Sequence, residues 1–274
     1  MFTEYQRKLV SIYSLAKAYL IDMIDDENAV EILEEYLTPH DCNQVEKLSQ
    51  IYFHLLKHAQ NANMKPKVIG QSIGGVKKLK PILFNFNAKK VLEHYGDDHE
   101  KLLDDIVEEL QPTGQVNREP EGLWVHYCQS ILSAAQFLCQ FKNSKAFYEW
   151  ANEYYQDETK IDELPQILAR EIHGIGYALA CDFLKEMGFA NYGKPDVHIK
   201  DILRGVGLTK EKAKETEIQA VLREMAKVNG VSAYHVDKIL WLIGSGEFYF
   251  HDFSTGQNKQ DFIDWFVEID KVGR

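Results

Sequence analysis

The sequence predicts an all-α protein. Apolar residues recur at spacings of three and four through most of the 274 residues, which is the pattern of amphipathic helices. Glycine and proline divide the pattern into segments of ordinary helix length, roughly a dozen in all. Strand character is confined to one aromatic stretch, 247–253. A chain of this length can bury a core as one large domain or two small ones.

The N-terminal part of the chain begins with amphipathic segments. Helices are predicted at 3–24, 27–37, 42–60, 88–96 and 100–110. Asn87 is expected to cap the fourth of these helices and Gly96 to end it. Glycine and proline break up the segment 64–81, which predicts a loop with one short helix.

The central and C-terminal parts continue the helical pattern. The most apolar segment, and the one expected at the centre of the fold, is 122–141. Further helices are predicted at 144–155, 162–172, 177–187, 197–205, 210–227, 232–244 and 259–270. Pro165 suits the first turn of its helix. We expect a region 1–120 that packs with the C-terminal helices, a core at 121–230, and helices at 231–274 that complete the fold.

Charge is distributed unevenly along the chain. With 31 Lys and Arg against 42 Asp and Glu, the net charge is −11, which argues against a general basic coat for nucleic acid. The segment 61–92 nevertheless has seven lysines and no acidic residue, whereas 93–121 has ten acidic residues. This separation of charge is consistent with a basic face that binds a polyanion. It is equally consistent with two ordinary solvated faces.

Membrane and metal signals are weak. No apolar run is long enough to span a bilayer, and the N-terminus lacks the features of a cleaved signal, so a cytoplasmic protein without a membrane partner is expected. The four cysteines are too far apart for a CxxC pair. They are expected to be buried thiols rather than zinc or redox ligands.

Two glycines flank one isoleucine between two predicted helices. In Gly174-Ile175-Gly176, glycine permits positive φ and close approach of the backbone to a ligand. The N–H groups of Gly174, Gly176 and Tyr177 would then lie at the start of a helix, where phosphate binds. A plain corner between two helices is the alternative.

Twenty residues further on, Asp196 follows Pro195 at a predicted helix start. There it can cap the helix, and the helix dipole favours its ionised form. Taken alone, such an aspartate is most often only a cap.

Together these elements resemble the helix-hairpin-helix DNA glycosylase superfamily, which includes endonuclease III and the 8-oxoguanine and alkylpurine glycosylases. The segment 172–176 is similar to the family's L-P-G-(V/I)-G hairpin, with His173 at the usual proline. Pro195-Asp196-Val197-His198-Ile199 is similar to its aspartate element. The specific likeness covers about 35 residues. It implies two packed helical domains with a cleft between them.

The resemblance implies a monomeric enzyme that flips a damaged or modified base out of double-stranded DNA and hydrolyses its N-glycosidic bond. Asp196 would be the catalytic carboxylate, stabilising positive charge on the sugar and directing water. The implied DNA contacts are His173, Gly174, Ile175, Gly176, Tyr177, His198 and Lys200. In relatives the hairpin carbonyls often hold a monovalent cation, which here implies K⁺ or Na⁺ at Arg170, Ile172 and Ile175.

The chain departs from the family pattern at the nucleophile. Bifunctional members carry a lysine two residues after the second hairpin glycine, and here that position is Ala178. A monofunctional enzyme is therefore expected, although Lys185, Lys194 and Lys200 lie near in sequence. No cysteine follows Asp196, so no iron–sulfur cluster is expected.

Other functions stay open at this stage. The chain is also consistent with a catalytically silent helix-hairpin-helix protein that binds DNA, and with a helical interaction scaffold. The excised base is not specified, and its source is either damaged DNA or modified foreign (phage) DNA. Aromatic side chains are candidates for stacking on a flipped base, but each is more often part of a core: Trp124, Trp150, Tyr192, Trp241 and those of 247–253.

Overall fold

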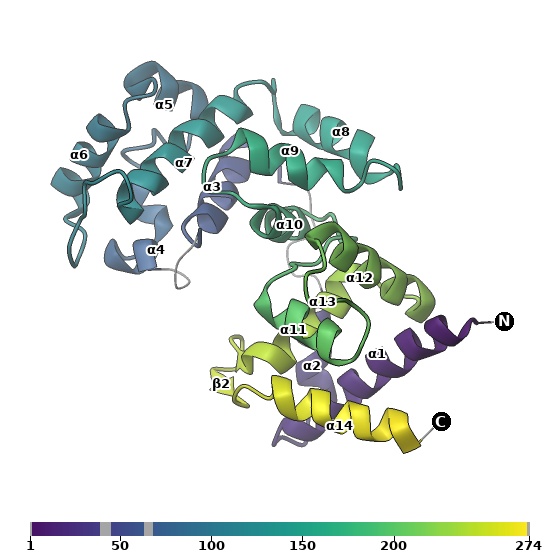
Figure 1. The fold of residues 1–274 in the computed structure, drawn as a ribbon. Helices are drawn as coiled ribbons and strands as arrows, with labels where there is room; N and C mark the ends of the chain where they lie inside the picture. The colour runs from purple at the N-terminus through teal and green to yellow at the C-terminus, as the bar shows by residue number, and fades with distance from the viewer. Residues whose placement is uncertain (1, 39–44, 63–67, 273–274) are drawn as a thin grey trace. The chain divides into compact units, whose positions relative to one another are not determined.

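A computed structural model describes residues 2–38, 45–62 and 68–272 (Figure 1). Contacts divide the chain into two units, Met1–Cys42 with Gly188–Arg274 (unit 1) and Asn43–Met187 (unit 2). Unit 1 is thus built from both ends of the chain. The regular secondary structure of the described residues is almost entirely helical, which confirms the predicted all-α class.

Unit 1 surrounds one central helix. Its elements are α1 (Glu4–Met23), α2 (Ala29–Leu37), α11 (Val197–Gly205), α12 (Glu215–Asn229), α13 (Ala233–Ser245), β1 (Glu247–Phe248), β2 (Phe253–Ser254) and α14 (Lys259–Val272). Helix α13 contacts each of the other five helices. Its apolar residues are buried with those of α1, including Leu9 and Ile12. The aromatic stretch 247–253 forms a small antiparallel hairpin, β1–β2.

Unit 2 is centred on the most apolar helix of the sequence, as predicted. Its elements are α3 (Leu48–Ala59), α4 (Val68–Ser72), the 3₁₀ helix η1 (Val76–Leu79), α5 (Ala88–Tyr95), α6 (His99–Leu110), α7 (Leu123–Leu138), α8 (Ser144–Tyr155), α9 (Glu163–Glu171) and α10 (Tyr177–Glu186). Helix α7 packs against α3, α5, α6 and α9. Most of its side chains are buried, including Cys128 and Ile131.

The two units differ from the domain boundaries expected from the sequence, 1–120, 121–230 and 231–274. Helices α1 and α2 pack with C-terminal helices, as that expectation allowed, but the remainder of 1–120 packs with 121–187. Local periodicity marks helices and carries no information on which distant helices share a core. The boundary between the units falls at Gly188, directly after α10.

Side-chain caps account for where several helices start. Asn87 accepts a hydrogen bond from the N–H of Lys90 at 3.1 Å and begins α5, as predicted. Asp98 caps α6 in the same way. Two starts differ from the prediction: α3 begins at Leu48 and α12 at Glu215. The N–H of Lys214 donates to the Glu217 carboxylate, and this capping bond begins α12 later than periodicity alone suggests.

A short left-handed segment precedes α5. Phe84, Asn85 and Phe86 have φ of 50°, 59° and 58°. None is glycine, and each such residue costs about 1–2 kcal/mol. The segment is fixed by its neighbours, because the N–H of Asn85 donates to the carbonyl of Lys80 and that of Asn87 to the carbonyl of Leu83.

A buried ionic cluster joins α3 to α10 within unit 2. His58 has 5% of its side chain exposed and lies 3.1 Å from Glu186 and 3.4 Å from Asp182. Lys185 pairs with Asp182 at 3.0 Å. Burial lowers the pKa of His58, but hydrogen bonds and charges from the two carboxylates outweigh it and raise that pKa to about 9. Burial raises the pKa of Glu186, yet His54 and His58 hold it well below its usual range.

No helix among the described residues is both long and apolar enough to cross a membrane.

The cluster predicts a bell-shaped dependence of stability on pH. The raised pKa of His58 means that its contribution is complete below about pH 6.5 and is lost as the pH rises through about 9. The lowered pKa of Glu186 means that its contribution is lost as the pH falls below its unfolded value. Replacing His58 with leucine should remove about 2 kcal/mol near pH 6 and much less at pH 9.5. Thermal unfolding of both proteins from pH 5 to 9.5 measures this, and a pH-independent difference would contradict it.

Candidate active site

The segment Ile172–Gly176 forms the turn between α9 and α10 in unit 2. Ile172 and Ile175 are buried at 1% and 2% exposure, so their side chains anchor the turn in the core. The N–H of Ile175 donates to the carbonyl of Ile172 at 3.2 Å. The predicted contribution of Ile175 to DNA binding can therefore come only from its backbone.

The two glycines of the hairpin differ in whether packing within the protein requires them. Gly174 has φ +74°, and a Cβ there would lie 2.8 Å from the hydroxyl oxygen of Ser130 on α7. Gly176 is exposed with φ −82°, and a Cβ there would meet no atom within 4 Å. Internal packing thus explains the first glycine and leaves the second unexplained. Because Gly176 has no side chain and lies at an exposed turn, a ligand can approach its backbone closely.

The hairpin presents backbone donors to solvent. Within the described part of the chain, the N–H groups of Gly174 and Gly176 donate no hydrogen bond. Gly176 is also the N-cap residue of α10, where the positive end of the helix dipole lies. These donors fit an anion such as a DNA phosphate without any lysine.

His173, at the position of the family's proline, is paired with a histidine that the sequence did not indicate. Its Nε2 lies 3.0 Å from Nδ1 of His126 on α7, with the rings at 10°. The N–H of His173 donates to Ser133 on the same helix at 3.0 Å. Desolvation, His126 and His99 lower the pKa of His173. The lowered pKa favours the neutral form of His173, and the exposed imidazole pair can donate a hydrogen bond to a phosphate.

The remaining predicted hairpin residues have internal partners. The hydroxyl of Tyr177 donates to Asp162 at 3.0 Å, which braces α10 against the start of α9. The guanidinium of Arg170 pairs with Glu171. Neutral backbone carbonyls suit a monovalent cation, but the carbonyl of Ile172 already accepts the N–H of Ile175. The cation at Arg170, Ile172 and Ile175 stays a prediction.

Asp196, in unit 1, is the N-cap of α11, as the sequence predicted. Its Oδ1 accepts the N–H groups of His198 at 2.9 Å and Ile199 at 3.2 Å. Its Oδ2 makes no hydrogen bond to any residue that the structure describes. One oxygen therefore orients the carboxylate while the other is available for chemistry.

Two buried polar side chains hold the loop that leads to Asp196. Asp237 on α13 is 1% exposed and accepts the N–H of Lys194 at 2.7 Å. Gln219 on α12 is fully buried and bonds both the N–H and the carbonyl of Gly193. Sequence reasoning missed both residues, since each resembles an ordinary polar position within a helix.

The pKa of Asp196 is raised. Desolvation is the largest cause and the charge of Asp237 the next, while the N–H of Ile199 and the charges of Lys194 and His198 act in the opposite direction. A carboxylate with a raised pKa is a stronger base than an exposed aspartate. Perturbation by burial and a charged neighbour is typical of functional carboxylates.

The other candidates near Asp196 are engaged in packing or ion pairs. His198 lies against Gly244 of α13, and its Nδ1 is buried without a hydrogen-bond partner among the described residues. Lys200 pairs with Glu215 at 3.1 Å and Arg204 with Asp201 at 3.0 Å. These ion pairs favour a structural role for Lys200 over the predicted phosphate contact.

The aromatic candidates separate into core and surface residues. Trp124 and Tyr192 are buried at 5% and 0% exposure, as expected for core side chains. On unit 1, the ammonium of Lys238 lies 5.3–5.6 Å from the ring centroids of three aromatic side chains. These are Tyr234, Trp241 and Tyr249. Lys238 follows Asp237 directly, so Lys238, Tyr234 and Trp241 lie on the helix that holds the Asp196 loop, and Tyr249 comes from the β1–β2 hairpin.

The alternative nucleophiles differ in exposure. Ala178, the position that carries lysine in bifunctional relatives, is partly exposed in the first turn of α10. Lys185 is 7% exposed within the ionic cluster of α3 and α10, and its pairing with Asp182 argues against it as a nucleophile. Among the described residues, no group of three or more His, Cys, Asp and Glu could hold a metal ion.

The all-α fold and the two sequence elements resemble the helix-hairpin-helix glycosylases, and comparison with known proteins supports this resemblance. An 8-oxoguanine DNA glycosylase/AP lyase of Korarchaeum cryptofilum is 31% identical over 99 residues, which cover 34% of this chain and 46% of that protein. The matched part thus spans less than half of the relative's length. No family model matches the sequence.

A solved structure shares the fold. The Methanocaldococcus jannaschii 8-oxoguanine glycosylase/lyase, determined in complex with a 15-mer DNA containing 8-oxoguanine, superimposes with a TM-score of 0.53 at 15% identity. The match covers 84% of this chain and 99% of that one.

The geometry predicts that alanine has different effects at the two hairpin glycines, on stability at Gly174 and on DNA binding at Gly176. Gly174→Ala forces a side chain into positive φ and against Ser130, so it should destabilise the protein by about 1–3 kcal/mol. Gly176→Ala should leave stability within about 0.5 kcal/mol, because the poorer N-cap is offset by the lower entropy of the unfolded chain, but weaken binding to a DNA duplex about tenfold. Thermal unfolding and fluorescence anisotropy measure the two effects. Unchanged DNA affinity in a folded Gly176→Ala protein would argue against the hairpin as a DNA contact.

Proposed function

We propose that this protein is a DNA glycosylase that hydrolyses the N-glycosidic bond of a damaged or modified base in double-stranded DNA. The observation that carries the proposal is the Asp196 carboxylate, which is fixed through Oδ1, unbonded through Oδ2 and raised in pKa. The likeness to two 8-oxoguanine glycosylases supports it. The protein would act as a monomer in the cytoplasm.

The chemistry requires a carboxylate of this kind. As the base departs, positive charge develops on the deoxyribose, and an ionised Asp196 stabilises it. The raised pKa strengthens Asp196 as the base that removes a proton from the attacking water. The base leaves with its bonding electron pair and takes up a proton, and the water oxygen bonds to the sugar carbon. The products are the free base and an abasic site.

The hairpin would supply sequence-independent contacts. Its two free N–H groups and the dipole of α10 bind a phosphate, while the His173–His126 pair adds a hydrogen-bond donor. A cation at the carbonyls of Arg170, Ile172 and Ile175 would reinforce this binding electrostatically. Because both relatives are named for 8-oxoguanine, that base is the first substrate to test, ahead of alkylated purines and modified phage bases.

The absence of lysine at 178 supports a monofunctional enzyme. Both relatives carry the word lyase in their names, and strand cleavage by such enzymes uses an amine that forms a Schiff base with the sugar. Alanine has no amine. Lys194, which adjoins the Asp196 loop, is the alternative nucleophile to test.

Asp196→Asn should abolish base release and leave DNA binding within about twofold. Asparagine is an equal N-cap, so the helix start is kept. Since the folded pKa of Asp196 is raised, its ionised form costs stability above that pKa, and the neutral variant should unfold at the same or a higher temperature. Base release from 8-oxoguanine, alkylated and phage-derived DNA is measured by mass spectrometry.

Asp98→Asn is the matched control, because Asp98 caps α6 through the same kind of bond. It should retain full activity. Base release that persists in the Asp196→Asn variant would contradict the assignment of Asp196 as the catalytic carboxylate. A wild-type protein that binds DNA in a salt-dependent manner but releases no base would favour the silent DNA-binding protein.

Borohydride should trap no covalent adduct between the wild-type protein and substrate DNA, since a monofunctional enzyme forms no Schiff base. Introducing Ala178→Lys should create trapping, if that position faces the sugar as it does in bifunctional relatives. An adduct with the wild type that disappears in Lys194→Gln would instead assign lyase activity to Lys194. Gel electrophoresis after reduction measures the adduct.

A further inference from the structure

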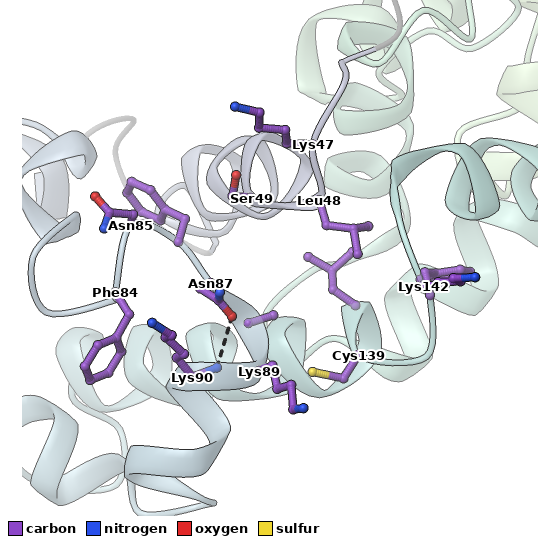
Figure 2. A pocket seen from close by; sticks show the side chains of 14 residues that line it. Lys47, Leu48, Ser49, Phe84, Asn85, Asn87, Lys89, Lys90, Cys139 and Lys142 are labelled. Atoms are coloured by element: carbon purple, nitrogen blue, oxygen red, sulfur yellow. Dashed lines mark hydrogen bonds between the residues drawn. The ribbon is translucent and has the colours of Figure 1, made fainter.

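A cavity of about 720 Å³ opens in unit 2 among the starts of α3 and α5 and the end of α7 (Figure 2). This volume is in the range that holds a nucleotide-sized ligand. Figure 2 shows Lys47 above the opening, Phe84 to its left and Lys142 to its right. Cys139, the C-cap residue of α7, lies at its lower edge and is exposed, contrary to the expectation that all thiols are buried.

The lining is cationic in a protein of net charge −11. Four lysines line the cavity, and no aspartate or glutamate does. They are Lys47, Lys89, Lys90 and Lys142. Lys89 pairs with Glu93 one turn further along α5. The other three have no ion pair among the described residues. A cavity with unpaired lysines attracts anions.

Neutral donors and rings complete the lining. The side chains of Asn85 and Asn87 and the rings of Phe84, Phe86 and Phe141 border the same space. Asn87 uses its carbonyl oxygen to cap α5, through the bond drawn in Figure 2. The left-handed segment Phe84–Phe86 brings these polar and aromatic groups together at the start of the helix. Lysines beside aromatic rings are suited to a nucleotide, because the lysines attract the phosphate and the rings stack on the base.

This cavity is separate from the hairpin. Both contact α3, but at opposite ends. Lys47–Ser49 at its start line the cavity, whereas Ala62, just beyond its end, lies against Gly174. The intervening residues span about 20 Å at the rise of an α-helix. A phosphate bound at the hairpin therefore does not occupy the cavity.

We propose that the cavity binds a nucleotide through its terminal phosphate, which the lysines hold while the phenyl rings contact the base. The ligand is either a free nucleotide or the 5′-phosphorylated end of a DNA strand, which present the same chemistry. The site is independent of base release and goes beyond the glycosylase function.

Cys139 provides a direct readout, because it is exposed at the cavity edge while Cys128 and Cys181 are buried. The rate of its alkylation by a neutral maleimide is followed by peptide mass spectrometry on the full-length protein. The probes are AMP, adenosine, and an oligonucleotide with or without a 5′-phosphate. We expect millimolar AMP to slow alkylation at least fivefold, and adenosine to have no effect.

Two charge-matched variants test the assignment. Lys90→Glu/Lys142→Glu should lose the protection, and Lys145→Glu/Lys160→Glu, which changes exposed lysines outside the cavity by the same charge, should keep it. Protection ratios are compared within each variant, since the lysines also influence the thiol. Protection by the 5′-phosphorylated strand alone would assign the site to DNA ends. No protection by any phosphorylated probe, equal protection by the 5′-hydroxyl strand, or equal loss in both variants would overturn the proposal.

Discussion

The candidate catalytic centre depends on how one carboxylate divides its two oxygens. Asp196 gives Oδ1 to the first turn of α11, and this pair of hydrogen bonds fixes the orientation of Oδ2. If the Asp196 side chain rotated, it would leave two partly buried N–H groups unpaired. Local folding of α11 therefore supplies the positional precision that catalysis requires.

That arrangement also depends on the loop that leads to Asp196, which hydrogen bonds hold in place. Residues 188–196 have little regular structure, and side chains of α12 and α13 bond the backbone of two of them. Gln219 bonds both polar groups of Gly193, and Asp237 holds Lys194. Placing a second acid so near Asp196 is unfavourable for folding, because the two charges repel. Such local cost is common where a protein keeps a reactive group ready.

Much of this fold follows from local sequence. Helical periodicity located the helices, and the capping residues Asn87 and Asp196 marked their starts, because caps and amphipathic faces are properties of adjacent residues. The hairpin was recognised from glycine spacing, yet the physical reason for Gly174 is the side chain of Ser130, more than forty positions earlier. His126, Gln219 and Asp237 act through contacts between distant helices. Their own segments carry no sign of the partner, so sequence alone could not assign them.

The discontinuous unit 1 has a consequence for the order in which the chain can fold during synthesis. Unit 2 is one continuous segment and can close as soon as α10 has left the ribosome. Helix α1 must wait, because it packs with α12 and α13, and α12 begins about 190 residues after α1 ends. At ordinary elongation rates that interval lasts roughly 10–40 s. During that interval α1 has only α2 to pack against, and the apolar surface that α12 and α13 later cover is exposed to chaperones.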